Sequence, residues 1–246
     1  MADSIVIFYI ALFIIAFLYA SVGHGGASGY LALMAIYGIS PDVMKPTALL
    51  LNMFVSIVSF FQFYRGGHFR MTLFWPLAIA SVPMAFVGGL IQMDNTVYKA
   101  ILGILLVIAV IRFLFFSNLK SGDIREMQII PALLIGAAIG FLSGLIGIGG
   151  GIILSPILLL LKWSTMKQTA AISALFIFVN SLSGLMGQLY KGINFSSDML
   201  MYVAVAFAGG LLGAYVGSLK LKAVALKNVL AAVLLVAAYK LLFTNA

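Results

Sequence analysis

The chain has 246 residues, of which 64% are hydrophobic and 8% are charged, and its formal net charge is +8. Soluble domains are about 45–50% apolar and about 25% charged, so this composition excludes a soluble globular fold and indicates an integral membrane protein. A lysine and arginine excess is usual in cytoplasmic loops of membrane proteins, so nucleic-acid binding is not expected; the sequence has no cysteine, which excludes disulfides, iron–sulfur clusters and thiol catalysis.

Long apolar segments follow one another along the chain, and we predict that each forms a helix. They are not the alternating stretches of about 10 residues that build outer-membrane barrels, and helices satisfy their backbone polar groups in lipid. In the first half the segments are 4–22, 26–37, 46–64, 72–92 and 97–116, and in the second half they are 129–147, 151–162, 168–190, 198–218 and 224–243. The second segment of each half is shorter than the about 20 residues that span a bilayer, so we expect it to cross incompletely or to dip in.

A duplication accounts for this order of segments. Two glycine-rich breaks, residues 17–27 and 141–151, superpose without a gap at an offset of 124. Four further matches keep the same order: Lys45–Ala48 with Lys167–Ala170, Tyr64–Phe69 with Tyr190–Phe195, Ala85–Gly88 with Ala214–Gly217, and Leu105–Val107 with Leu234–Val236. We therefore predict an all-α polytopic membrane protein of two repeats, 1–116 and 129–246, each with about five helical segments, joined by a polar cytoplasmic connector over 117–128.

The distribution of basic residues favours inverted repeats. If the first two segments of each half form a hairpin, one side of the membrane carries ten of the 14 lysines and arginines and the other carries four. If each broken pair is instead one discontinuous crossing, the split is seven to seven. Since lysine and arginine concentrate in short cytoplasmic loops, the inverted arrangement is preferred, with both termini in the periplasm and the connector in the cytoplasm.

The two breaks are the candidate substrate site. Hydrophobic helices interrupted at corresponding positions in two halves indicate a transporter's binding site, and the free N–H groups at the start of each following short helix suit an anion. The alternative is that these glycines serve only close helix packing. The candidate residues in the breaks are Ser21, Gly23, His24, Gly25, Gly26, Ala27, Gly147, Gly149, Gly150 and Gly151.

Other polar residues are candidates for supporting roles. Asn52 and Asn180 lie deep in apolar segments, where an amide needs a partner, and each could bind substrate or tie helices together. Lys45 and Lys167, each followed two residues later by Thr47 or Thr169, could steer anions or gate the pathway, although lysine at these positions also suits plain interfacial anchoring. The acidic residues all fall at predicted helix ends or loops, which argues against a cation transporter.

The second break and the segment after it resemble the TauE/SafE family of sulfite exporter-like transmembrane anion transporters. The resemblance is carried by Gly144–Gly151, Thr169–Ser173 and Phe178–Ser181, and by the degenerate first copy, Gly23–Gly26 with Lys45–Ala48. It implies export of a small sulfur-containing anion, such as sulfite or the organosulfonate sulfoacetate. The first copy departs from the triple-glycine pattern at Ala27, which leaves open whether both copies bind substrate equally.

These observations predict a secondary transporter that exports such an anion across a bacterial cytoplasmic (inner) membrane by alternating access. An anion channel, or a carrier for another small carboxylate or oxyanion, is the alternative. We expect no enzymatic activity, no cofactor and no metal site. The expected partners are the small anionic substrate and the lipid bilayer, with a homodimer left open as an assembly and no nucleic acid.

Overall fold

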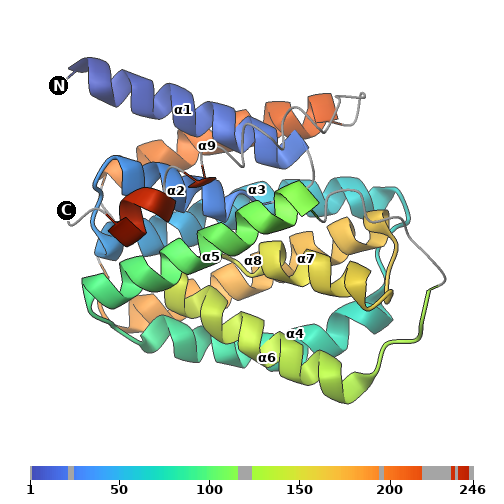
Figure 1. The fold of residues 1–246 in the computed structure, drawn as a ribbon. Helices are drawn as coiled ribbons and strands as arrows, with labels where there is room; N and C mark the ends of the chain where they lie inside the picture. The colour runs from blue at the N-terminus through green and yellow to red at the C-terminus, as the bar shows by residue number, and fades with distance from the viewer. Residues whose placement is uncertain are drawn as a thin grey trace.

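The computed structural model describes residues 2–21, 25–115, 124–193, 197–217, 234–235 and 238–243, and helices are the only regular elements in these ranges. The first half contains α1 (Ala2–Ser21), α2 (Ala27–Ile36), α3 (Pro41–Arg65), α4 (Met71–Leu90) and α5 (Asn95–Phe115). The second half contains α6 (Ile129–Ile146), α7 (Gly151–Leu160), α8 (Met166–Tyr190) and α9 (Ser197–Gly217). The predicted all-helical polytopic fold is confirmed (Figure 1).

The predicted segments match the observed helices closely, and the largest difference is at the start of α3. This helix begins at Pro41, whereas the prediction placed its start at residue 46. Proline is favoured in the first helical turn because its missing N–H would have no partner there, and Ser40 supplies the extended residue before it. Pro46 then lies inside the helix and does not begin it. Most of the predicted segment 224–243 lies outside the described residues. The parts of it that are described, 234–235 and 238–243, are helical.

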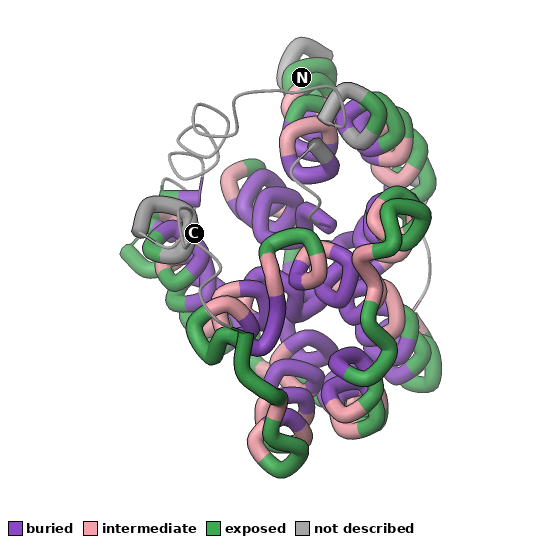
Figure 2. Tube along the Cα trace, turned by 90° about the vertical axis from the view of Figure 1, so that its right-hand side faces the viewer, coloured by how far each residue is buried: buried purple, intermediate pink, exposed green. Residues whose placement is uncertain are grey.

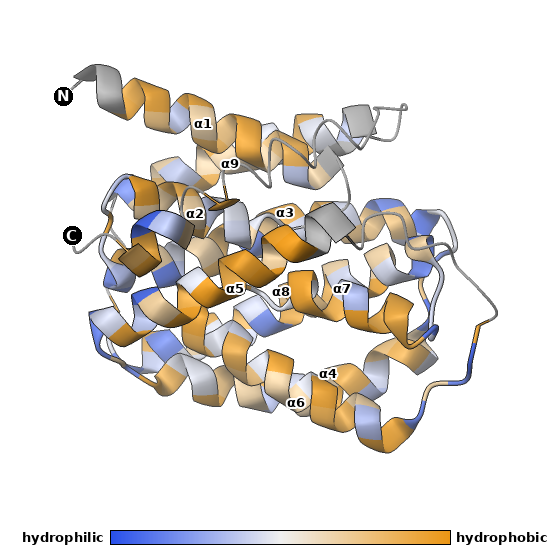
Figure 3. Cartoon of the chain, in the orientation of Figure 1, coloured by the Kyte–Doolittle hydropathy of each residue, from blue (hydrophilic) through white to orange (hydrophobic). Residues whose placement is uncertain are grey.

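Helix lengths agree with a multi-pass membrane protein whose second segments are short. Among the described helices, α3, α4, α6 and α8 are long and apolar enough to cross a membrane. Helices α2 and α7 have ten residues each, which confirms the short second segment of each half. Buried residues lie on the inner sides of the helices (Figure 2). Large apolar side chains such as Ile79, Ile130 and Leu134 are exposed, and the helices that carry them, α4 and α6, are largely hydrophobic (Figure 3).

The helices pack in pairs that each have a counterpart in the other half. In Figure 1, α1 and α9 lie along one edge, α4 and α6 lie along the opposite edge, and α3 and α8 lie between them. By order along the chain, α1 to α4 of the first half correspond to α6 to α9 of the second half. The counterpart of the α4–α6 pair is then the α9–α1 pair, and the counterpart of the α2–α3 pair is the α7–α8 pair. The predicted duplication of a unit of about five segments would produce this pattern.

The α4–α6 pair is held by backbone contact at glycines. A Cβ added to Gly136, Gly140 or Gly144 would overlap the carbonyl oxygens of Leu77, Ser81 and Ala85 respectively. Both series advance by four residues, so the two helices run parallel along one packing ridge. Helices α1 and α9 pair in the same way, because Gly209 and Gly213 lie against the carbonyls of Phe13 and Phe17. Small residues permit this close approach within a membrane.

The central helices α3 and α8 run in opposite directions. Leu49, early in α3, approaches Gly184, late in α8, with 3.5 Å between the leucine Cδ1 and the Cβ position of the glycine. Further along α3, Asn52 meets Gly149 beside Ile177, which lies earlier in α8. Helices α3 and α8 are the third helices of their halves. These two equivalent helices are therefore antiparallel.

Candidate functional site

The glycines in the breaks adopt backbone conformations that other residues avoid. Gly26, the residue before α2, has φ of +89°, and Gly147, Gly149 and Gly150 have φ of +88°, +74° and +77°. A Cβ disfavours this left-handed region, whereas glycine enters it freely. These turns end α6 and begin α2 and α7, so the glycine pattern in the sequence has a direct backbone cause.

Ala27 does not weaken the first break. Both Ala27 and its counterpart Gly151 are the first residues of their short helices, and neither has a positive φ. Gly151 is small because a Cβ there would overlap the side chain of Ile177. The departure from the triple-glycine pattern therefore falls at a position that requires no left-handed backbone.

The two breaks converge on the same two side chains. A Cβ at Gly25 would lie 3.0 Å from Cγ2 of Ile177 and 3.1 Å from Oδ1 of Asn52. A Cβ at Gly149 would lie 2.6 Å from Nδ2 of Asn52 and 3.0 Å from the same Ile177 methyl carbon. Asn52 of α3 and Ile177 of α8 thus separate one break from the other, and bare backbone from each half faces this point.

A small cavity marks the meeting place. Its volume is about 10 Å³, close to the smallest space that holds a single water. A sulfite ion is several times larger than a water molecule, so it would enter only if the lining moved apart. The lining residues are Tyr19, Gly25, Gly26, Ala27, Ser28, Asn52, Ile148, Ile152 and Ile177.

Asn52 is the outstanding polar group of this cavity. It is fully buried, and neither its amide nitrogen nor its amide oxygen has a hydrogen-bond partner among the described residues. Buried polar groups are nearly always paired, because each unmade hydrogen bond costs about 1–3 kcal/mol. A side chain in this state is suited to a ligand that brings its own hydrogen-bonding atoms.

The structure does not bring Asn180 to the same place. Its Nδ2 donates to the carbonyl of Phe176 at 2.8 Å, and it does not line the cavity. Helices α3 and α8 each have 25 residues, so aligning their ends pairs Asn52 with Ile177. The two halves therefore offer an amide on one side of the site and an aliphatic side chain on the other.

The remaining predicted residues divide between the breaks and their surroundings. Gly23, His24 and the side chain of Ser21 lie outside the described residues. Gly147 packs against the backbone of Lys45, with 2.9 Å from its Cβ position to the Lys45 carbonyl oxygen, and Gly150 packs against Ile139 and Phe176. These two glycines shape the second break without lining the cavity.

The predicted gate residues have dissimilar surroundings. Thr47 is buried and donates to the carbonyl of Val43 at 2.6 Å, whereas Thr169 shares a 2.7 Å hydrogen bond with Ser164. Lys167 is exposed in the first turn of α8. Lys45 is half-buried and donates to the carbonyl of Ile91 at 3.2 Å. Lys45 lines the large cavity described below, and Lys167 lines neither that cavity nor the small one.

The predicted site omitted five of the lining residues, which are Tyr19, Ser28, Ile148, Ile152 and Ile177. The hydroxyls of Tyr19 and Ser28 are 2.6 Å apart and join the end of α1 to the start of α2. A buried tyrosine and a serine on either side of a break could have been selected by their hydrogen-bonding capacity. Ile177 carries no such signal, because only the end-to-end alignment of α3 and α8 places it opposite Asn52.

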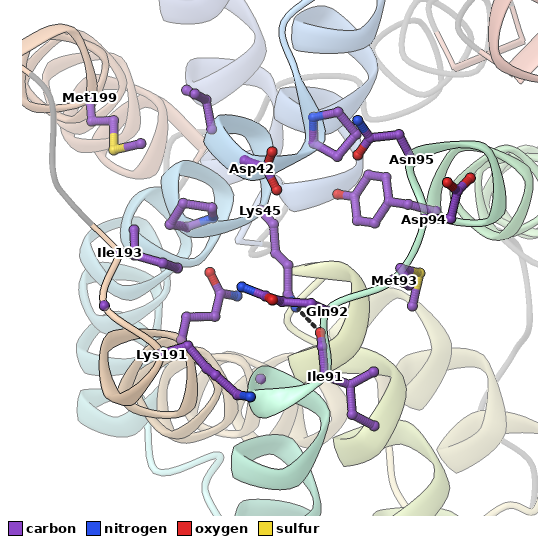
Figure 4. Close-up of a pocket in the computed structure, with 17 residues that line it drawn as sticks. Asp42, Lys45, Ile91, Gln92, Met93, Asp94, Asn95, Lys191, Ile193 and Met199 are labelled. Atoms are coloured by element: carbon purple, nitrogen blue, oxygen red, sulfur yellow. Dashed lines mark hydrogen bonds between the residues drawn. The ribbon is translucent and has the colours of Figure 1, made fainter.

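A much larger cavity opens beside the second break, and we call it the vestibule. Its volume is about 680 Å³, and its walls come from the start of α3, the α4–α5 turn and the end of α8. Figure 4 shows Lys45 reaching across it to Ile91, with Asp42, Asp94 and Lys191 around it. Hydrogen bonds from Thr96 lower the pKa of Asp94, which is exposed. The vestibule thus mixes two lysines with two acids.

The vestibule touches the second break directly. Tyr98, in its wall, donates its hydroxyl to the carbonyl of Ile146, the last residue of α6, at 2.8 Å. Lys45, also in the wall, has its backbone against Gly147. In the described ranges, no three histidine or acidic side chains gather in a way that could hold a metal ion.

Comparison with known proteins identifies what this chain is similar to. Residues 8–241 match the model of the family described as "Sulfite exporter TauE/SafE". A probable membrane transporter protein of Sinorhizobium fredii is 38% identical over 238 residues, which cover 95% of this chain and 96% of that protein. Another from Methanocaldococcus jannaschii is 29% identical over 80% of this chain and 76% of its own length. The probable membrane transporter protein YunE of Bacillus subtilis is 25% identical over 72% of each. No solved structure matches.

Proposed function

The chain belongs to the TauE/SafE family of membrane transporters, and from this premise we propose that it exports a small sulfur-containing anion. The substrate class is sulfite or an organosulfonate such as sulfoacetate, and the mechanism is alternating access across a bacterial cytoplasmic membrane. The match to the sulfite exporter family and the relatives' names as probable transporters support transport as the activity. The choice of a sulfur-containing anion rests on the family description, while the geometry of the breaks supports an anion and alternating access.

The convergence of the two breaks is the observation that carries this proposal. Gly25 and Gly149 approach the same pair of side chains, Asn52 and Ile177. Helices α2 and α7 begin immediately after the breaks, so unpaired N–H groups and the positive ends of two helix dipoles lie close to this point. Broken helices that aim their N-termini at a negatively charged group are a known transporter design.

The chemistry of the lining favours an anion over a cation. The described residues around the small cavity include hydroxyl groups, an amide and exposed backbone, but no aspartate or glutamate. A cation site in a membrane usually supplies carboxylates. An oxyanion would accept hydrogen bonds from the Asn52 amide, the break N–H groups and the Tyr19–Ser28 hydroxyl pair.

The opposite directions of α3 and α8 support inverted repeats. In this arrangement residues 1–116 and 129–246 form the two membrane repeats, the connector over 117–128 is cytoplasmic, and both termini are periplasmic. Lys45 and Lys191 then lie on the side with fewer basic residues, so the vestibule opens toward the periplasm. A large cavity on the periplasmic side and a cavity too small for the substrate at the breaks suit a carrier that must rearrange during transport.

Transport by the purified chain in liposomes tests the proposal. Uptake of radiolabelled sulfite, sulfate, thiosulfate, sulfoacetate and acetate is compared, with and without a pH gradient. We expect saturable uptake of sulfite or sulfoacetate that is accelerated by unlabelled anion on the opposite side. Flux without saturation or counterflow would indicate a channel, preferential acetate uptake would indicate a carboxylate carrier, and transport of cations alone would refute an anion site.

A further inference from the structure

The vestibule contains a buried polar side chain that the proposed pathway has not used. Gln188, in the last turn of α8, lines the vestibule and is only 2% exposed. Its amide nitrogen and oxygen both lack a hydrogen-bond partner among the described residues. As with Asn52, an unpaired amide in such a place is costly unless something binds it.

Lys45 brings a positive charge to the same wall. Its ammonium group donates to the carbonyl of Ile91 at 3.2 Å and interacts electrostatically with Asp42, the neighbouring carboxylate in the first turn of α3. Asp42 and Asp94 also line the vestibule, but both are exposed to solvent. An ammonium group that is half-buried beside a neutral carbonyl keeps most of its capacity to bind an anion.

The antiparallel packing of α3 and α8 places these two residues together. Leu49 approaches Gly184, as described above. Lys45 lies one helical turn before Leu49, and Gln188 lies one turn after Gly184, so both extend toward the same end of the helix pair. Gly89, near the end of α4, packs on the carbonyl of Gly184, which brings the Ile91 carbonyl to the same wall.

We infer that Lys45 and Gln188 form a second anion site in the vestibule, separate from the site at the breaks. It would hold a free small oxyanion through the lysine ammonium group and the glutamine NH₂, with the ammonium leaving the Ile91 carbonyl as the anion binds. This inference rests on the proposed anion transport. Because the Lys45 backbone packs directly on Gly147, an anion bound at this site would lie beside the second break.

The closing experiment counts bound anions. Radiolabelled sulfite is equilibrated with the purified full chain in detergent, and the number bound per chain is measured for the wild type and for Gln188→Glu, Lys45→Gln and Asn52→Leu. Gln188→Glu keeps the side-chain shape but places a repelling carboxylate in the site. Lys167→Gln is the matched control, since it removes the same charge from an exposed position outside the vestibule.

We expect two anions per chain in the wild type and in Lys167→Gln, and one in each of the other three variants. One anion in the wild type that survives Gln188→Glu and Lys45→Gln but is lost in Asn52→Leu would overturn the vestibule site and leave the proposed function standing. No binding to the wild type would instead refute the proposed function. Circular dichroism and elution as a single species establish that each variant is folded.

A lipid headgroup offers the same phosphate-like chemistry, so a second arm separates the sources. The measurement is repeated in micelles with added phosphatidylglycerol. A vestibule site for free oxyanions keeps two sulfites per chain in both conditions. Loss of one sulfite on addition of the lipid, restored when lipid is removed, would assign the vestibule to a headgroup and overturn the inference.

Discussion

Asn52 of α3 and Ile177 of α8 occupy equivalent positions in helices of equal length, and both contact Gly25 and Gly149. The two repeats therefore meet at one point where a polar side chain faces an apolar one. A substrate at this point would be hydrogen-bonded mainly from the side of the first repeat. The two halves share backbone geometry at this point but differ in the chemistry of the side chain that they place there.

Replacement of Asn52 by leucine should separate function from stability. Leucine has nearly the same size, and it removes both unpartnered amide atoms, so we expect an unchanged or higher melting temperature in detergent. A hydrogen bond to a charged group contributes about 1.5–3 kcal/mol, so sulfite transport in liposomes should fall by about 10–100-fold. Asn180→Leu is the control, and equal losses in the two variants would contradict the special position of Asn52.

Gly149→Ala should reduce both stability and transport. The left-handed backbone costs an alanine about 1–2 kcal/mol, and the added Cβ would press on Nδ2 of Asn52. Gly67→Ala is the matched control, because Gly67 has φ of +69° in the α3–α4 turn with no atom within 4 Å of its Cβ position. Thermal unfolding should shift similarly from the backbone effect, while transport should be lost only in Gly149→Ala. Retained transport there would argue against the breaks as the site.

We expect the addition of a single methyl group at the α4–α6 crossing to destabilise the protein. In an exposed helix, glycine to alanine stabilises by about 1 kcal/mol, but a Cβ at Gly140 would overlap the carbonyl of Ser81. Overpacking of this kind typically costs about 1–3 kcal/mol. We therefore expect Gly140→Ala to lower the melting temperature, and Gly213→Ala to do the same at the corresponding α1–α9 crossing. A stabilised Gly140→Ala variant would show that the two helices are not in backbone contact.

The proposed orientation in the membrane can be measured because the sequence has no cysteine. Thr96 and Glu126 are both exposed, the first at the start of α5 and the second in the connector. A membrane-impermeant maleimide applied to intact cells should label Thr96→Cys and spare Glu126→Cys until the membrane is permeabilised. The reverse labelling pattern would show that the protein has the opposite orientation in the membrane. Labelling of both variants in intact cells would contradict the inverted-repeat arrangement.

The helices were largely predictable from the sequence because apolar segment length and glycine breaks are local properties. The start of α3 was misplaced because Pro46 was read as a boundary, although the chain had already begun its helix at Pro41. The convergence of Gly25 and Gly149 was expected from the repeat, but the residue opposite Asn52 was not. Asn180 has the same residue type as Asn52, whereas Ile177 has the equivalent position in its helix. Only the packing of α3 against α8 shows which of the two lies opposite Asn52.

The vestibule could not have been predicted from spacing. Gln188 was one polar residue among several in its segment, and its burial depends on Gly184 packing against both Leu49 and Gly89. Lys45 and Lys167 match as a sequence motif, but the end-to-end alignment of α3 and α8 that pairs Asn52 with Ile177 pairs Lys45 with Ala170. Lys45 lines the vestibule, whereas Lys167 is exposed. Their environments differ because the neighbouring helix ends differ, and a linear motif does not record these.

The crossed pairing of α1 with α9 and of α6 with α4 means that neither half of this protein is self-sufficient. Each half would leave the glycine-lined or carbonyl-lined face of its outer helices bare if it were made alone. A half expressed alone is therefore expected to bury these faces only by pairing with the other half.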